Sequence, residues 1–439
     1  MTVNAARMIG VDQLPVARTE IELSCPPQRI ELANKVQGAG TIMALVRLHT
    51  HPVGIVLLDG ALGTSWECHR RRVWDAVGRA VGEHCQEDGL SPESQPGTLT
   101  LNGRVPGCVL RRRAARADAA KISVVVATRE RPESLRMCLK ALFEVDYPAY
   151  EVIVVDNDPL TTATAAMVQE EFDGVVRYVR EPDRGLASAH NRGVAEASGK
   201  FIAFVDDDVI VDRHWLEAIA EGFAAADDVG CVTGLILPSE LDTRAQLLLE
   251  QHGGFDKGFG LRIYDSGPHR PDHPLFPFTP GRFGSGANMA FDAAILRGMG
   301  GFDKATGVGT YARGGDDLAA IFRVVLDHRV VYQPSAIVWH RHHRELDALR
   351  NQAFGYGVGL GAFLASALVH EPRAWPTLLR RLPAGLRYAF SAHSDRNRGR
   401  YDGWPAEFTR LERRGLLYGP VAYAISRWRK RRRIALPAT

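Results

Sequence analysis

The sequence predicts an α/β protein built on an open sheet flanked by helices. From Lys121 onward, short β-branched runs alternate with segments of helical spacing, which is typical of strand–helix–strand units. Polar residues follow several of these runs, most prominently Asp206, Asp207 and Asp208 after the apolar run Phe201–Val205. With 439 residues, 45% of them hydrophobic and 24% charged, the chain is long enough for about two or three soluble domains.

Residues 1–90 are expected to form a small α+β accessory domain. Thr41–His49 and Val53–Asp59 are β-prone runs that Thr50, His51 and Pro52 separate, which predicts a hairpin. Apolar residues within Ser65–Cys85 recur near one face of a helix.

Residues 91–120 are interpreted as a linker because they are rich in Gly, Pro and Ser and end in a run of Arg and Ala. The alternative is a pair of strands within Leu99–Leu110. The six cysteines lack CxxC or CxxH spacing, so free thiols in a reducing compartment are expected and a structural zinc is not. They are Cys25, Cys68, Cys85, Cys108, Cys138 and Cys231.

The central domain is expected to span residues 121–345. Its strands are predicted at Lys121–Ala127, Tyr150–Val155, Val175–Arg180, Phe201–Val205 and Val229–Leu237, with helices at Glu133–Leu142, Thr161–Phe172, Leu186–Ala197 and His214–Ala226. Such units form right-handed crossovers, and ligands bind beyond the carboxyl ends of the strands. Thr128, Asp156 and the aspartate triplet all lie at those ends.

The second half of this domain is less regular. Ser239–Thr279 is predicted to be a long functional loop rich in Gly, His, Pro and aromatic residues. A helix is expected at Leu318–Leu326, followed by two short strands at Val330–Tyr332 and Ala336–Trp339.

An ordered set of motifs gives the chain a family resemblance over about 121–350. They are SVVVATRERP at Ser123–Pro132, VVDND at Val154–Asp158, NRG at Asn191–Gly193, FVDDDV at Phe204–Val209, GSGANMAF at Gly284–Phe291, GGFD at Gly300–Asp303 and ARGGDDL at Ala312–Leu318. The chain resembles family 2 glycosyltransferases, inverting enzymes with the GT-A fold, an open mixed sheet flanked by helices. The resemblance implies a nucleoside diphosphate-sugar donor and a glycan, lipid or small-molecule acceptor, with a role in cell-envelope glycan synthesis.

The resemblance also assigns a donor site. It places Thr128, Glu130 and Asp156 around the base and ribose, Arg184 near a phosphate, and Asn191 among the residues that bind the donor. An exposed turn carboxylate is the alternative for Glu130, and an unengaged surface residue is the alternative for Arg184.

The DxD motif of the family corresponds to Asp206 and Asp208, which implies Mn²⁺ or Mg²⁺ bridging the two phosphates. Asp207 keeps no assigned role. His340 is a candidate third ligand, and an imidazole favours Mn²⁺ over Mg²⁺; the alternative for His340 is a surface cluster with the neighbouring His and Arg residues.

Inversion requires a base that removes the proton of the acceptor hydroxyl. The resemblance assigns this role to Asp317, the second residue of an acidic pair, with Asp316 orienting the acceptor or capping the helix. Gly315 would allow the backbone to approach the sugar closely, and Asn288 would contact a sugar hydroxyl.

Three rival functions are weighed against a glycosyltransferase. A catalytically inactive GT-A scaffold that binds glycans or partners is disfavoured by the presence of Asp208 and Asp317. A nucleotidyltransferase is disfavoured because the first turn, ATRERP, lacks glycines. The absence of G-x-G-x-x-G after the first strand argues against a dinucleotide-binding domain, and the absence of GxxxxGK[ST] argues against a P-loop enzyme. A membrane-embedded polysaccharide synthase would need several spanning helices.

Residues 346–439 are expected to be helical and basic. From Glu371 to Thr439 there are 16 Lys/Arg and 5 Asp/Glu, although the whole chain has a net charge of only +3. Ala353–Val369 is an uncharged apolar run, short for a spanning helix and more typical of a buried one. Basic residues among Leu, Trp and Tyr, as in Leu378–Tyr388 and Trp428–Arg433, predict a cytoplasmic protein in peripheral contact with an anionic membrane. No nucleic-acid-binding fold accompanies them, so no nucleic-acid partner is expected.

Overall fold

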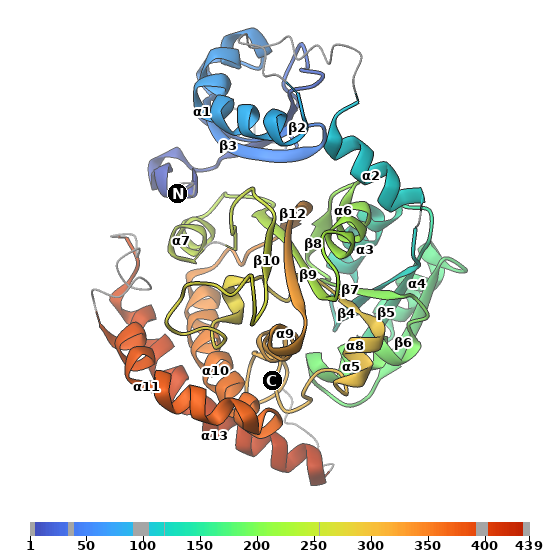
Figure 1. The fold of residues 1–439 in the computed structure, drawn as a ribbon, viewed down its shortest axis with the longest axis vertical. Helices are drawn as coiled ribbons and strands as arrows, with labels where there is room; N and C mark the ends of the chain where they lie inside the picture. The colour runs from blue at the N-terminus through green and yellow to red at the C-terminus, as the bar shows by residue number, and fades with distance from the viewer. Residues whose placement is uncertain are drawn as a thin grey trace.

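The structure is a computed structural model that describes residues 5–33, 39–90, 105–117, 119–253, 255–391 and 403–432. An N-terminal unit, a central sheet domain and a layer of C-terminal helices follow one another along the chain (Figure 1). The N-terminal unit lies at one end of the molecule, and the C-terminal helices wrap the other end.

The N-terminal unit is a three-stranded sheet covered by one helix. Strands β1 (Ala17–Glu22), β2 (Thr41–Leu48) and β3 (His51–Asp59) form it, with β1 parallel and β3 antiparallel to β2. Helix α1 (Trp66–Glu87) packs on the sheet through Val73, Val77 and Val81. The expected hairpin and helix are present, and β1 is an additional strand that the sequence did not indicate.

The other face of this small sheet is docked onto the central domain. Met43 and Leu45 share one buried cluster with Leu235, Ile337 and Trp339 of the central domain. The N-terminal unit and the central domain therefore share a hydrophobic interface and are not joined by a linker alone.

The linker interpretation is wrong for residues 107–117, which form helix α2 (Gly107–Ala117). Arg112 of α2 is buried and pairs with Glu221 at 3.1 Å and Glu217 at 3.7 Å, both on helix α6 (Trp215–Ala224). These ion pairs fix α2 against the central domain. The strand pair considered for Leu99–Leu110 is excluded at residues 107–110, and residues 99–104 lie outside the described part.

The central domain contains one large mixed sheet of nine strands, in the order β10-β12-β9-β11-β7-β4-β5-β6 with β8 paired to β12. The strands are β4 (Ile122–Thr128), β5 (Tyr150–Asn157), β6 (Val176–Glu181), β7 (Phe201–Asp206), β8 (Val209–Val211), β9 (Val229–Pro238), β10 (Arg262–Tyr264), β11 (Asn288–Asp292) and β12 (Arg329–His340). β4, β5, β6 and β7 are parallel, whereas β11 is antiparallel to both β7 and β9. The predicted open mixed α/β sheet is confirmed.

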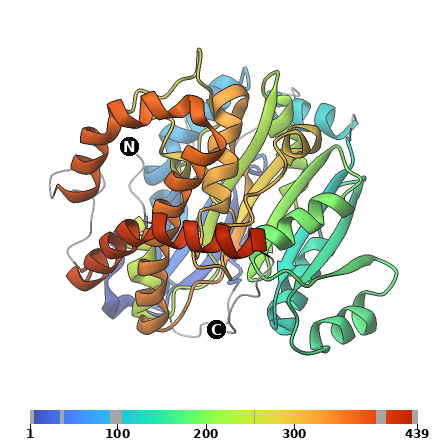
Figure 2. The ribbon, with the colours of Figure 1, turned by 90° about the horizontal axis from the view of Figure 1, so that it is seen from below.

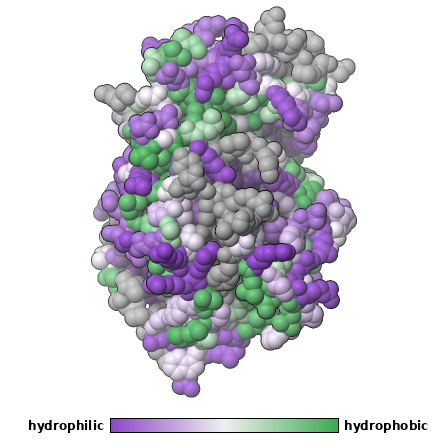
Figure 3. Space-filling view, turned by 90° about the vertical axis from the view of Figure 1, so that its left-hand side faces the viewer, coloured by the Kyte–Doolittle hydropathy of each residue, from purple (hydrophilic) through white to green (hydrophobic). Residues whose placement is uncertain are grey.

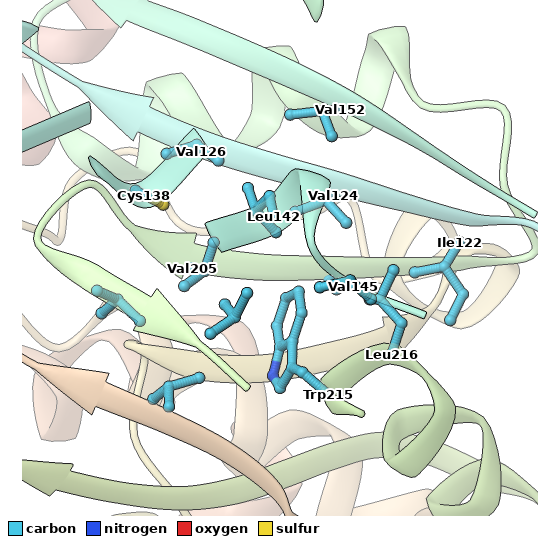
Figure 4. Close-up of a cluster of buried hydrophobic side chains, with 14 of the residues drawn as sticks. Ile122, Val124, Val126, Cys138, Leu142, Val145, Val152, Val205, Trp215 and Leu216 are labelled. Carbon is cyan, nitrogen blue, oxygen red and sulfur yellow. The ribbon is translucent and has the colours of Figure 1, made fainter. Parts of the chain in front are cut away.

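Helices cover both faces of this sheet. They are α3 (Pro132–Phe143), α4 (Ala163–Phe172), α5 (Leu186–Glu196), α6, α8 (Ala293–Gly298) and α9 (Asp316–Asp327). Figure 4 shows one core cluster, in which Trp215 of α6 lies among Val205, Leu142 and Leu216 beneath the strands. Because the strands are buried on both faces, they read in sequence as nearly continuous apolar runs.

Two predicted segments differ from the structure. The 239–279 segment is not irregular throughout, because it contains helix α7 (Arg244–Gly253) and strand β10. The two short strands expected at 330–339 are one strand, β12, interrupted by an irregularity between Gln333 and Ile337. The pairing of β12 with β8 sets His340 opposite Val209, one residue from Asp208.

Three further helices close the structure: α10 (Leu346–His370), α11 (Trp375–Phe390) and α13 (Ala406–Arg432). α10 crosses α13 closely at Gly357 and Gly361, where an added Cβ would collide with the backbone of Glu412 and Leu416. In the described part of the chain, only α10 is long and apolar enough to cross a membrane, and half of its most apolar window is buried against protein.

Helix α13 runs across the central domain (Figure 2). Its Tyr423 hydroxyl donates to Asp303 Oδ2 at 2.8 Å, and Lys430 Nζ donates to the carbonyl of Arg184 at 2.7 Å. The C-terminal helix is thereby attached to two loops that border the carboxyl edge of the sheet.

Candidate active site

The aspartate triplet lies where β7 ends and β8 begins. Asp208 Oδ1 is 3.3 Å from Nε2 of His340. Ligand atoms of Asp206, Asp208 and His340 all lie within 4.8 Å of one another. The structure thus brings together all three predicted metal ligands, and Asp208 Oδ1 is a buried oxygen that accepts no hydrogen bond.

The electrostatics of the triplet favour a cation. Burial, followed by the neighbouring charges of Asp208 and Asp207, raises the pKa of Asp206 well above its usual range. Burial also raises the pKa of Asp207, to about 6. Carboxylates in this state repel one another, and a divalent cation between them offsets that repulsion.

Asp207, which had no assigned role, is held by two neighbours. Thr128 Oγ1 donates to its Oδ2 at 2.6 Å, and Arg131 Nη1 donates to its Oδ1 at 3.2 Å. Arg131 also donates to Asp208 Oδ2 at 3.2 Å. The predicted position of Thr128 beside the base and ribose is therefore corrected: its hydroxyl is engaged with Asp207 and positions the triplet.

A chain of hydrogen bonds orients His340. Glu250 Oε1 is 2.6 Å from His342 Nε2, and His342 Nδ1 is 2.9 Å from His340 Nδ1. If His342 donates to the carboxylate, its Nδ1 accepts from His340, which leaves the lone pair of His340 Nε2 facing Asp208. Burial lowers the pKa of His340 to about 4, so the ring is neutral and able to ligate a metal.

Asp156, the residue before the last in β5, has one carboxylate oxygen that accepts no hydrogen bond. Its Oδ2 accepts from the hydroxyl of Tyr178 at 2.7 Å, whereas its Oδ1 is buried and accepts no hydrogen bond. Burial raises the pKa of this carboxyl group. A buried acceptor of this kind is suited to a ligand N–H group.

The Glu130 carboxylate is near Asp156, whose pKa its charge helps to raise, but it is bound to the segment after β5. Its carboxylate accepts from the backbone N–H groups of Leu160 and Thr161 at 2.8 and 3.1 Å and from the Thr161 hydroxyl at 2.9 Å. These bonds lower its pKa and tie the first turn to the segment after β5. The contact of Glu130 with the base or ribose stays a prediction.

The turn before α5 contains Arg184, which is about nine-tenths buried. Asn157 Oδ1 accepts from the next backbone N–H, that of Gly185, at 2.8 Å, which attaches this turn to the end of β5. Asn191 points elsewhere: its amide both donates to and accepts from the backbone of Phe302, each at 2.8 Å. The predicted donor contact of Asn191 is therefore corrected to a structural bond that fixes the GGFD loop.

Asp316 and Asp317, the acidic pair at the start of α9, lie in different environments. Asp316 is buried, and its Oδ2 lies 3.5 Å from Nδ1 of His190. Asp317 is partly exposed; its Oδ2 accepts from the N–H of Gly286 at 2.9 Å, and its Oδ1 accepts from that of Leu318 at 2.8 Å. Burial, followed by the charge of Asp316, raises the pKa of Asp317 to about 6.

Two further donor contacts are corrected. Gly315 has φ 87°, and an added Cβ would collide with the backbone oxygen of Gly359, so α10 and not a sugar requires glycine there. Asn288 is buried, with its amide nitrogen donating to the carbonyls of Leu235 and Ala336 at 3.1 and 2.8 Å. Its oxygen accepts from the indole of Trp215 at 2.9 Å, which leaves no group for a sugar hydroxyl.

Sequence reasoning missed five residues at this site: Arg131, His190, Glu250, His342 and Tyr356. Tyr356 of α10 carries an exposed ring, and burial of its hydroxyl followed by the charge of Asp317 raises its pKa. The sequence drew attention to two of them only, because Arg131 lies in the motif ATRERP and His342 lies in the motif HRHH. The other three come from helices whose positions are set by the fold.

Comparisons with known proteins show what the sheet domain is similar to. Residues 123–297 match the family described as glycosyl transferase family 2. The chain carries a family 2 glycosyltransferase domain. The match runs from β4 to β11 of the mixed α/β sheet, and the curated relatives that match are glycosyltransferases.

Curated relatives are distant. A glucosyl-dolichyl phosphate glucuronosyltransferase from Haloferax volcanii is 26% identical over 258 residues, 54% of this chain and 75% of that protein. A pre-mycofactocin glycosyltransferase from Mycobacterium tuberculosis is 24% identical over 264 residues, 59% of this chain and 50% of that protein. The chain thus spans three quarters of one relative and half of the other.

Two solved structures are similar to part of the chain at low sequence identity. A mannosyltransferase from Pyrobaculum calidifontis in complex with GDP-Man and Mn²⁺ is 17% identical, with a TM-score of 0.43 over 73% of this chain and 93% of that one. Glucosyl-3-phosphoglycerate synthase from Mycobacterium tuberculosis is 18% identical, with a TM-score of 0.38 over 59% of this chain and 82% of that one.

Proposed function

We propose that the protein is an inverting, metal-assisted glycosyltransferase that moves a sugar from a nucleoside diphosphate donor to an acceptor hydroxyl. The observation that carries this proposal is the convergence of two acidic groups. The cluster of Asp206, Asp208 and His340 lies close enough to Asp316 and Asp317 that the latter two contribute to the raised pKa of Asp206. Such an arrangement places a cation for the leaving group and a carboxylate for the acceptor in one site.

The cluster Asp206, Asp208 and His340 fits Mn²⁺ or Mg²⁺. Two carboxylates are hard oxygen ligands for either ion, and the imidazole favours Mn²⁺. The ion, when bound, neutralises charge that develops on the leaving diphosphate. Arg131 holds Asp207 and Asp208 in place, and the Glu250–His342 pair holds the imidazole of His340.

Asp317 is the general base in this proposal. It is accessible, it is fixed by the N–H of Gly286, and its raised pKa makes its carboxylate a stronger base than an ordinary aspartate. Asp316 is buried against His190 and neither faces an acceptor nor caps the helix through its side chain. It acts as a positioning residue that also raises the pKa of Asp317.

Asp156 receives the nucleotide base in this scheme, because its Oδ1 is a buried acceptor without a hydrogen bond. Arg184 lies on the turn that Asn157 attaches to β5, which places its positive charge at the same edge as the phosphate site. The inactive-scaffold and nucleotidyltransferase alternatives are disfavoured, since the side chains proposed as metal ligands lie together and the family match spans the sheet from β4 to β11.

A donor screen tests the proposal. The protein is incubated with Mn²⁺ and each UDP-, GDP- and dTDP-sugar, and nucleoside diphosphate release and thermal shift are measured. We expect at least one donor to raise the melting temperature and to be hydrolysed slowly or transferred. If none does so while the protein remains folded by circular dichroism, the proposal fails.

The acceptor side is proposed to include a lipid surface. Trp375, Leu379, Leu382 and Leu386 are exposed at helical spacing along α11, and arginines lie between them. Figure 3 shows the side of the molecule on which α11 lies, where hydrophobic residues reach the surface among hydrophilic ones. A Trp/Leu stripe flanked by arginine is typical of a helix that lies on an anionic membrane face.

This contact agrees with a glycan or lipid-linked acceptor, and the relative from Haloferax volcanii is named for a dolichyl phosphate substrate. Co-sedimentation with vesicles containing phosphatidylglycerol tests it. We expect Leu379→Glu/Leu386→Glu to abolish binding and Leu417→Glu, at an exposed position on α13, to leave it unchanged. Wild-type protein that stays in the supernatant at low salt would contradict the membrane contact.

A further inference from the structure

A second cluster of metal-ligating side chains shares no residue with the candidate active site. It consists of His49, His84, Asp88 and Cys108, whose ligand atoms all lie within 4.8 Å of one another. Three segments supply them: the β2–β3 turn, the last turn and end of α1, and the first turn of α2. Nothing in the proposed transfer reaction uses these residues.

The distances within this cluster match those of a tetrahedral metal site. Cys108 Sγ lies 3.5 Å from His84 Nε2 and 3.6 Å from His49 Nδ1. A tetrahedral zinc ion, with bonds of about 2.3 Å to sulfur and about 2.1 Å to nitrogen, holds these two kinds of atom about 3.6 Å apart.

The carboxylate completes the same geometry. Asp88 Oδ2 lies 3.3 Å from His84 Nε2 and 3.7 Å from His49 Nδ1. Two nitrogen or oxygen ligands of one tetrahedral zinc ion lie about 3.4 Å apart. Four side chains from three segments thus leave a space of the size that one zinc ion fills.

The two oxygens of Asp88 have different roles. Oδ1 accepts from the backbone N–H of Cys108 at 2.7 Å and from Arg111 at 3.3 Å. Oδ2 is buried and accepts no hydrogen bond, although the Asp88 side chain is only 1% exposed. A buried carboxylate oxygen without a hydrogen bond is costly unless a cation meets it.

The cluster is closed to substrates. Side-chain exposure is 4% for His49 and 15% for His84, and Cys108 is 1% exposed. Glu22 accepts from the backbone N–H groups of His49 and Thr50 at 3.0 and 2.8 Å and so fixes the turn that presents His49. Four protein ligands and a closed environment characterise structural zinc sites, whereas catalytic sites keep an open position.

We propose that His49, His84, Asp88 and Cys108 bind one structural Zn²⁺ ion. One thiolate, two imidazoles and one carboxylate suit zinc better than Mg²⁺ or Ca²⁺, which take oxygen ligands. The ion joins α1 and the β2–β3 turn to α2, and Arg112 of α2 pairs with Glu221 of the central domain. Zinc therefore fastens the N-terminal unit to the glycosyltransferase domain, and this assignment does not depend on the proposed reaction.

Zinc analysis of the full chain tests this assignment. The protein is purified without chelator and dialysed against excess Mg²⁺, which occupies the aspartate cluster, and its zinc is measured by mass spectrometry. We expect about one zinc ion per chain in the wild type and in Asp208→Asn, and less than about a tenth of that in Cys108→Ala. Cys85→Ser is the matched control, because Cys85 is a buried cysteine of α1 beside His84 but outside the cluster; it should retain the zinc.

Cobalt substitution gives a second readout that only a thiolate site produces. Titration of metal-free wild type with Co²⁺ should yield a thiolate-to-cobalt charge-transfer band and the visible bands of tetrahedral cobalt. Cys108→Ala should lose the charge-transfer band, and Cys85→Ser and Asp208→Asn should keep it.

Wild-type protein that contains no zinc and gives no thiolate–cobalt band would overturn the proposal. Zinc that is retained in Cys108→Ala but lost in Asp208→Asn would overturn it as well. If Cys108→Ala fails to fold, the wild-type titration decides the question on its own, and His84→Gln serves as the second variant.

Discussion

Two clusters of metal-ligating side chains, each formed within the described residues, differ in chemistry and in access. Asp206, Asp208 and His340 are mainly carboxylate ligands, all partly exposed, at the carboxyl edge of the large sheet. His49, His84, Asp88 and Cys108 include a thiolate and are almost fully buried between α1 and α2. An oxygen-rich open cluster suits an ion that is exchanged with a substrate, whereas a closed cluster with sulfur suits an ion that stays.

The contrast also concerns how each cluster is held. The open cluster depends on long-range positioning: Arg131 and Thr128 hold Asp207, and the Glu250–His342 pair orients His340. The closed cluster depends on neighbouring turns, with His84 and Asp88 one helical turn apart. Disturbing the first should therefore change catalysis, and disturbing the second should change stability.

The largest expected effect is that of Asp208→Asn. Loss of one carboxylate ligand should lower the transfer rate about a thousandfold, because the leaving diphosphate loses its counter-charge. The measurement is product formation at saturating donor and Mn²⁺, with unfolding followed by circular dichroism. Asp228→Asn, at an exposed aspartate paired with His328, is the control that should transfer normally. Near-normal transfer by Asp208→Asn would remove Asp208 from the metal site.

Asp317→Asn should lower transfer about a hundredfold or more while donor affinity stays unchanged, because a general base acts on the acceptor and not on the donor. Donor affinity is measured by calorimetry and transfer by product formation. Asp327→Asn, at the other end of the same helix, should behave as the wild type. Equal losses of donor binding and transfer would show that Asp317 holds the donor instead.

The pH dependence of the wild type should report the same carboxyl group. The base must be deprotonated, and the pKa of Asp317 is raised to about 6, so the rate should fall as the pH drops below that value. At pH 5 we expect about a tenth of the plateau rate. The profile is measured at saturating donor and Mn²⁺; a rate that stays constant down to pH 5 would contradict the assignment.

His342→Ala should have a smaller, selective effect. Removal of the residue that orients His340 should raise the Mn²⁺ concentration needed for half-maximal activation about 10- to 100-fold. The transfer rate at saturating Mn²⁺ should stay largely intact. Mn²⁺ titration of the transfer rate measures both quantities. His328→Ala, remote from the cluster, should leave both unchanged. A lower rate at saturating Mn²⁺ with unchanged Mn²⁺ affinity would argue against this positioning role.

Removal of zinc from the closed cluster should have the smallest effect on catalysis. At zinc concentrations about 100 times the dissociation constant, binding adds about 2.7 kcal/mol to the free energy of unfolding. A chelator followed by Mn²⁺ should therefore restore transfer while the melting temperature stays several degrees lower, and added Zn²⁺ should recover it. A melting temperature that Mn²⁺ alone restores would assign the stability effect to the open cluster.

The sequence by itself determined the large sheet, the aspartate triplet at the end of β7 and the acidic pair at the start of α9. These follow from local patterns, because buried parallel strands are continuous apolar runs and polar groups gather where such strands end. It also indicated His340 through its place at the end of a strand. The direction in which a side chain points at those ends was not determined, so Thr128 was assigned to the base although its hydroxyl donates to Asp207. Asn191, Gly315 and Asn288 were assigned to the donor although the structure shows them in contact with other parts of the protein.

Only the tertiary structure decided which distant residues meet. Pairing of β8 with β12 sets His340 beside Asp208, and the position of α7 brings Glu250 to His342. His49, His84, Asp88 and Cys108 are scattered over 60 positions without metal-binding spacing, and they meet because α1 and α2 pack against the β2–β3 turn. Sequence spacing reveals a metal site when neighbouring residues form it, whereas packing creates one from separate segments.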